Sequence, residues 1–72
     1  MNIDFTNFEQ LVDLMDHADD YPTMLMGEDE NENLVTTSIL SDRVIVETYQ
    51  SNDWIRVKTY WRDGTIEETY KR

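Results

Sequence analysis

The chain has 72 residues, no cysteine and a formal net charge of -10, from 16 Asp and Glu against 6 Lys and Arg. A chain this short forms one domain, residues 1–72, and buries too little surface to enclose a catalytic cavity. The charge disfavours free nucleic acid and anionic membranes as direct partners and favours basic proteins.

Residues 1–10 carry no cationic segment and no apolar run, and no apolar stretch in the chain reaches 18 residues. We therefore expect neither a secretory signal nor a membrane span, and we expect a cytoplasmic protein.

The first predicted element is an amphipathic helix that begins near Asn7 and runs to about Asp19. Thr6 and Glu9 have the spacing of a capping box. Pro22 disfavours helical backbone at the residue before it, so the helix should end before this point. The apolar positions recur at helical spacing and form one stripe: Phe8, Leu11, Val12, Met15 and Ala18.

Strands are predicted for the rest of the chain. A short extended segment at 22–26 precedes a polar connection, "GEDENEN", at 27–33. β-Branched and aromatic residues then favour three strands, Leu34 to Leu40, Val44 to Gln50 and Trp54 to Trp61. The prediction is an α+β fold, with one N-terminal helix packed on a four- to five-stranded antiparallel meander.

"WRDGTI" predicts a hairpin with Asp63-Gly64 as a two-residue turn. This register places three residue pairs on the face that we expect the helix to cover together with Ile55: Trp61 with Ile66, Thr59 with Glu68, and Val57 with Tyr70. The opposite face then holds three other pairs: Tyr60 with Glu67, Lys58 with Thr69, and Arg56 with Lys71.

The charge is unevenly distributed, because residues 1–42 contain eleven acids and no Lys or Arg. On the predicted helix, Glu9, Asp13, Asp16 and Asp20 are spaced 4, 3 and 4 residues apart and form one stripe. Like charges at these spacings destabilise a helix, and acids near its C-terminus oppose the helix dipole. Such an arrangement is either a solvated face or a surface for an electropositive partner.

In length, charge, lack of cysteine and predicted helix-plus-meander pattern, the chain resembles small acidic inhibitors encoded by phages and mobile elements, including anti-CRISPR proteins and DNA mimics. The resemblance implies a non-enzymatic inhibitor in a bacterial host cell, which occupies the nucleic-acid-binding groove of a nuclease or other defence protein. On this hypothesis carboxylates imitate the phosphates of DNA. The predicted partner-binding residues are Glu9, Asp13, Asp16, Asp19, Asp20, Glu28, Asp29, Glu30 and Glu32, with Tyr21 and Trp54 as aromatic anchors.

Other groups of residues give weaker evidence for a functional site. The acidic connection lacks the Gly and Glu positions of a calcium-binding EF-hand loop, and His17 is the only histidine, so no metal site, cofactor or catalytic residue is predicted. Trp54, Arg56, Lys58 and Tyr60 alternate along one strand. This aromatic-basic face gives the alternative function, a small homodimeric interaction or assembly protein.

Overall fold

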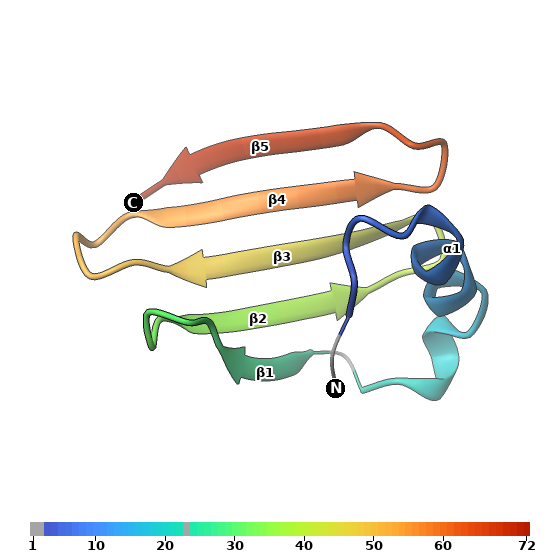
Figure 1. The fold of residues 1–72 in the computed structure, drawn as a ribbon, viewed down its shortest axis with the longest axis horizontal. Helices are drawn as coiled ribbons and strands as arrows, with labels where there is room; N and C mark the ends of the chain where they lie inside the picture. The colour runs from blue at the N-terminus through green and yellow to red at the C-terminus, as the bar shows by residue number, and fades with distance from the viewer. Residues whose placement is uncertain (1–2, 23) are drawn as a thin grey trace.

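The computed structural model describes residues 3–22 and 24–72. Figure 1 shows one N-terminal helix followed by five antiparallel strands in the order β1-β2-β3-β4-β5, which confirms the predicted α+β meander. Thr23, in the predicted extended segment, lies outside the described residues. The elements are α1 (Phe8–Asp16), the 3-10 turn η1 (Ala18–Asp20), β1 (Leu25–Glu28), β2 (Leu34–Ile39), β3 (Arg43–Tyr49), β4 (Ile55–Trp61) and β5 (Ile66–Lys71).

The predicted helix ends were only partly right. Asn7 caps α1, since its side chain accepts a hydrogen bond from the backbone N–H of Gln10 at 3.1 Å. The expected capping box is wrong, because the Thr6 hydroxyl donates to the Asp4 carboxylate instead. At the other end, the backbone N–H of His17 bonds to the carbonyl of Leu14, three residues back, and α1 gives way to η1.

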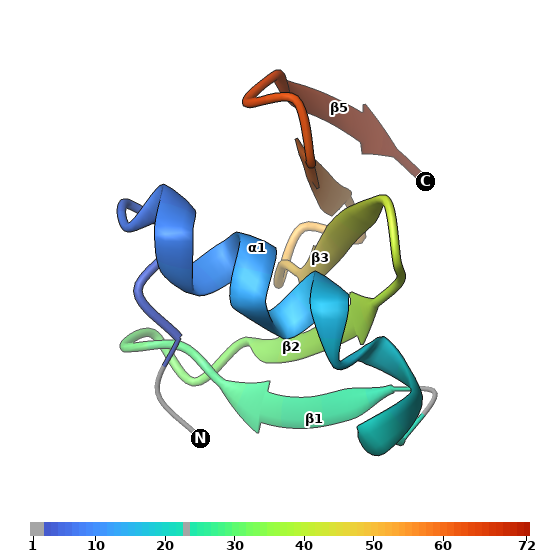
Figure 2. The same ribbon diagram turned by 90° about the vertical axis from the view of Figure 1, so that its right-hand side faces the viewer.

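The core lies between α1 and one end of the sheet. Leu11, Leu14 and Met15 are buried there against side chains of β2, β3 and β4, and Val44 is fully buried. Figure 2 shows α1 lying over one side of the sheet only. The predicted apolar stripe omitted Leu14 and included Phe8, which is 47% exposed.

Three hairpin connections share one geometry, formed by residues 29–33, 50–54 and 61–65. In each, the first residue accepts a bond from the fourth and donates one to the carbonyl of the fifth. The fourth residue adopts the left-handed conformation, with φ of 64° at Glu32, 69° at Asp53 and 94° at Gly64. These are three-residue loops ending in a left-handed residue, a common hairpin type.

This geometry overturns the predicted register of the last hairpin. Three residues, 62–64, form the loop instead of two, so Tyr60 pairs with Ile66 and Lys58 with Glu68. The pairs expected from a two-residue turn are therefore wrong by one position, and a shift of one residue moves each β5 side chain to the other face.

The expected helix-covered face of β4 is also wrong. Tyr60 lies under the helical layer, 6% exposed, and its ring stacks on Phe5 with centroids 4.9 Å apart. Ile55 and Val57 instead lie on the face that α1 leaves open, with Trp61. Apolar content misled the prediction because an uncovered sheet face also carries large apolar side chains.

The left-handed position at Asp53 gives a test of the hairpin geometry. Asp53→Gly is expected to raise the free energy of unfolding by about 0.5 to 1 kcal/mol, because a side chain in this conformation costs about 1 to 2 kcal/mol and the entropy of glycine offsets only part of the gain. Urea unfolding measures the change. Asp53→Asn controls for the lost charge, and Glu30→Gly, at an ordinary φ, should lower stability. Equal effects of both glycines would contradict the assigned geometry.

Candidate functional site

Five of the predicted partner-binding acids gather on the helical segment. We call them the helix acids, and all are exposed in the structure. The apolar stripe of α1 fixes their orientation, because burial of that stripe turns the opposite side to solvent. The helix acids are Glu9, Asp13 and Asp16 of α1, and Asp19 and Asp20 of η1.

The other four predicted acids, the turn acids, lie where β1 turns into β2: Glu28, Asp29, Glu30 and Glu32. Figure 1 shows this turn at the end of the sheet away from α1. The structure therefore does not bring the two groups together. The expectation that the acidic connection extends the helical stripe does not match this placement, because β1 runs between the two groups.

The Asp29 side chain stabilises the turn between β1 and β2. Its carboxylate accepts hydrogen bonds from the backbone N–H groups of Asn31 at 2.8 Å and Asn33 at 2.9 Å, and from the Asn33 side chain at 3.1 Å. These bonds, the one from the Asn33 backbone first, lower the pKa of Asp29 below its ordinary value. Asp29 therefore shapes the turn that presents its three acidic neighbours.

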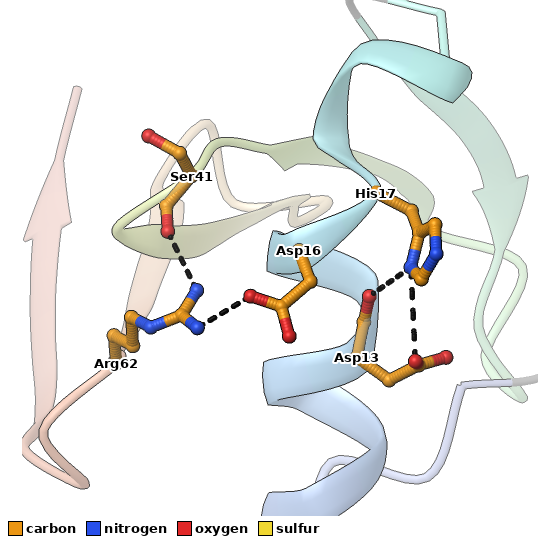
Figure 3. A network of polar contacts seen from close by, with 5 residues as sticks. All are labelled: Asp13, Asp16, His17, Ser41 and Arg62. Atoms are coloured by element: carbon orange, nitrogen blue, oxygen red, sulfur yellow. Dashed lines mark hydrogen bonds and ion pairs between the residues drawn. The ribbon is translucent and has the colours of Figure 1, made fainter.

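A cation that local spacing could not predict compensates Asp16. Figure 3 shows Arg62, from the β4–β5 connection, reaching both Asp16 and Ser41. Its Nη2 donates to the Asp16 carboxylate and its Nη1 to the Ser41 carbonyl at 3.2 Å. The backbone N–H of Arg62 also donates to the Asp42 carbonyl at 2.9 Å. Arg62 thus ties the end of α1 to two turns of the sheet.

The Asp16–Arg62 pair gives a second prediction. Both side chains are nearly half exposed, so solvent and salt screen the pair, and its coupling energy should be about 0.2 to 1 kcal/mol. Arg62→Gln alone should cost about 1 kcal/mol, because the bond to the Ser41 carbonyl is weakened as well. A double-mutant cycle with Asp16→Asn, measured by urea unfolding, isolates the coupling. No coupling at low salt would show that the pair does not form in solution.

His17 lies among the helix acids and responds to them. Its Nδ1 donates to the Asp13 carbonyl at 2.9 Å and lies 3.7 Å from the Asp13 carboxylate. The backbone bond raises the pKa of His17 above the ordinary value, and the charges of Asp13, Asp20 and Asp16 raise it further. The stabilisation from the protonated ring is complete below the unfolded pKa of about 6.5, and it is lost as pH rises through the folded pKa.

An NMR titration of His17 checks this directly. We expect a native pKa above about 6.5, and Asp13→Asn should bring it part of the way back, because the carbonyl bond remains after the charge is removed. Glu30→Gln, a charge change at the far end of the sheet, should leave the titration unchanged. A His17 pKa at or below that of the unfolded chain would contradict the contact with Asp13.

All six Lys and Arg side chains are engaged within the chain. Four form ion pairs: Arg43 with Asp42, Arg56 with Glu68, Arg62 with Asp16 and Lys71 with Glu47. Lys58 and Arg72 lie over aromatic rings, at 5.4 Å from Tyr60 and 4.7 Å from Trp54. Within residues 3–22 and 24–72, Asp16 alone among the helix acids and turn acids has a Lys or Arg within 4.0 Å.

The predicted aromatic anchors lie apart. Tyr21 follows η1, is half-buried and packs against the core. Trp54 is 36% exposed and precedes β4, so it lies at the end of the sheet away from α1. Neither is placed beside the other, and only Tyr21 lies near the helix acids in the chain.

The aromatic-basic face also differs from its prediction. Tyr60 is part of the core, and the Arg56 and Lys58 side chains are held by Glu68 and by the Tyr60 ring. Tyr60 is therefore not available to the homodimer surface expected from Trp54, Arg56, Lys58 and Tyr60, whereas the other three side chains are at least partly exposed.

Comparison of the chain with protein-family models, curated proteins and solved structures finds no match. No helix among the described residues is long and apolar enough to cross a membrane. The same part of the chain holds no cluster of three or more His, Cys, Asp or Glu side chains arranged for a metal ion.

Proposed function

We propose that this protein is a non-enzymatic inhibitor whose helix acids bind the electropositive nucleic-acid-binding groove of a nuclease or another host defence protein. One observation carries the proposal: all six Lys and Arg side chains are engaged within the chain, while four of the five helix acids have no Lys or Arg partner among the residues that the structure describes. A partner that holds Lys and Arg ready for DNA phosphates supplies the missing charges.

The position of the helix acids supports this role. Three of them lie on the short, capped helix α1, whose opposite side is held in the core, and the other two lie on the hydrogen-bonded turn η1 that follows, so their backbone is ordered before binding. An ordered acidic surface loses less conformational entropy on association than a flexible acidic tail does. Asp16 contributes less than its neighbours, because Arg62 already binds its carboxylate.

The groove at the start of α1 is lined by none of the helix acids. The groove between the start of α1 and the β4–β5 hairpin has a volume of about 570 Å³ and is lined mainly by apolar side chains. General acid–base chemistry requires two ionisable groups in contrasting environments around a substrate. The helix acids are instead all exposed, and Asp19 lines a shallow hollow beside Asp42 and Arg43.

Affinity capture from a bacterial lysate tests the proposal. The native chain is compared with a four-acid variant, Glu9→Gln, Asp13→Asn, Asp19→Asn and Asp20→Asn, which keeps Asp16 and its bond to Arg62. A matched control neutralises four acids elsewhere: Asp42→Asn, Asp53→Asn, Asp63→Asn and Glu67→Gln. Both variants have the same net charge, so any difference between them reports position and not total charge.

We expect the native chain and the matched control to capture a nucleic-acid-binding protein that duplex DNA displaces and that rising salt releases. The four-acid variant should capture none of it. Equal capture by all three proteins, or capture that DNA does not displace, would refute the proposal. A separate variant tests whether the turn acids add to the same contact, by comparing its capture of the partner with that of the native chain. It carries Glu28→Gln, Glu30→Gln and Glu32→Gln.

A further inference from the structure

The face of the sheet opposite α1 is uncovered by any described element, and it carries many apolar side chains around the central Glu47. Figure 2 shows the helix on the other side. We call this surface the open sheet face. The strand register places large apolar side chains from four strands on it: Met26, Leu34, Ile45, Tyr49, Ile55, Val57 and Trp61.

The amount of exposed surface is high for a chain of this size. The accessible surface is 5128 Å², against about 4,700 Å² expected for a compact monomer of this mass. Six apolar residues are buried in the core, while Met26, Leu34 and Tyr49 of the open sheet face are 71%, 40% and 39% exposed. Exposed apolar side chains that gather on one face in this way mark an interaction site.

The open sheet face is nearly neutral within a strongly acidic protein. Lys71 lies 3.5 Å from Glu47 across the face, and the Arg43 guanidinium lies over the Trp61 ring at 5.1 Å. The register also places Glu28 and Glu67 on this face, so two cations stand against three acids and its formal charge is about -1. The helix acids lie on the other side of the sheet. A basic partner is therefore attracted elsewhere on the molecule, and the open sheet face fits a surface that is itself apolar and nearly neutral.

Unsatisfied polar atoms also collect on this face. Among the described residues, the buried side-chain polar atoms without a hydrogen-bond partner are Thr36 Oγ1, Arg43 Nε and Trp61 Nε1. All three residues belong to the open sheet face by register. Native proteins leave few such groups unpaired. Neighbouring side chains enclose each of these atoms, so a second copy would cover their residues without contacting the atoms themselves.

We infer that two copies of this chain associate through the open sheet face about a two-fold axis. The same surface of a second copy has the required properties: it is apolar, nearly neutral and of equal size. The molecule measures 34 by 22 Å in the plane of Figure 1, which suits the area of about 800 Å² that each partner contributes to a stable interface. Packing the two sheets face to face leaves both sets of helix acids on the outside.

Sedimentation equilibrium of the full chain from micromolar to millimolar concentration tests the inference. The mass should rise from one chain toward two, and added salt should strengthen the dimer, because two chains of charge -10 repel each other less when screened. The variant Ile45→Thr with Val57→Thr should raise the dissociation constant at least about 100-fold, since each dimer loses four apolar side chains. Threonine preserves the preference for strand.

The control removes the same residue types from the helix side of the sheet, as Val35→Thr with Ile66→Thr, and should dimerise like the native chain. Trp61 gives an independent signal: in a Trp54→Phe chain its emission should shift to shorter wavelength with concentration, even if a threonine variant fails to fold. A single-chain mass at every concentration overturns the inference, as does a dimer that persists in the folded open-face variant.

These outcomes are separate from those of the proposed inhibitor function. Capture of a basic partner weakens with salt and is lost when the helix acids are neutralised. The dimer instead strengthens with salt, and neutralising the helix acids should strengthen it as well, because the charge repulsion between the two copies falls.

Discussion

Tyr60→Ala is expected to lower the free energy of unfolding by about 3 to 5 kcal/mol. Tyr60 is 6% exposed, lies in the cluster that joins α1 to the sheet, and stacks on Phe5. A domain of this length has a total stability of only about 4 to 11 kcal/mol, so the variant should be largely unfolded in mild urea. Urea unfolding followed by circular dichroism measures the loss.

Tyr70→Ala is the matched control, since Tyr70 has the same side chain on the neighbouring strand and is 55% exposed. Its loss should stay below about 1 kcal/mol. The comparison also tests the register, because the sequence alone placed Tyr60 on the outer face. Equal losses from the two substitutions would show that Tyr60 is not in the core.

The four-acid variant is expected to gain stability while it loses binding. Asp19 and Asp20 lie past the C-terminal end of α1, where each anion costs about 0.3 to 1 kcal/mol. Glu9 lies in the first turn, where its charge is favourable, so neutralising it offsets part of the gain. The net increase in the free energy of unfolding should be about 1 kcal/mol, and urea unfolding at low salt measures it.

The affinity for the bound protein should fall at least about 100-fold. Removing one charge of a buried ion pair in an interface typically costs about 2 to 5 kcal/mol, because the opposite charge stays buried without a counter-charge. Stability lost for the sake of binding is typical of functional surfaces. The salt dependence of the free energy of unfolding gives a control, since added salt should stabilise the native chain more than the four-acid variant. If the four-acid variant is less stable than the native chain and binds the partner equally well, the helix acids stabilise the fold and do not bind the partner.

The candidate site was partly predictable from sequence. Four of the five helix acids were identified from their spacing, and Asp19 from its place near the predicted helix C-terminus, because the apolar stripe of a helix fixes which residues face solvent. The Arg62 contact with Asp16 was not, since 46 residues separate the two and no local pattern links them. The role of Asp29 in its turn was also missed, although Asp followed by Asn residues is typical of such turns.

The open sheet face was also not predictable from the sequence. The alternation of Ile55, Val57 and Trp61 predicted a buried face, and the opposite residues Arg56, Lys58 and Tyr60 predicted an exposed one. Alternation establishes that a strand has two different faces, but it does not determine which face a helix covers. The burial of Tyr60 between Phe5 and Val44 decided this.

The sequence by itself determined the α+β meander, the approximate strand positions and the imbalance of charge, because periodicity, turn residues and composition act over short distances along the chain. Only the tertiary structure decided the register of the last hairpin, the face that α1 covers, the separation of the helix acids from the turn acids, and the partner of Asp16. Each of these depends on contacts between residues far apart in the chain, where the packing of one element on another outweighs local preference.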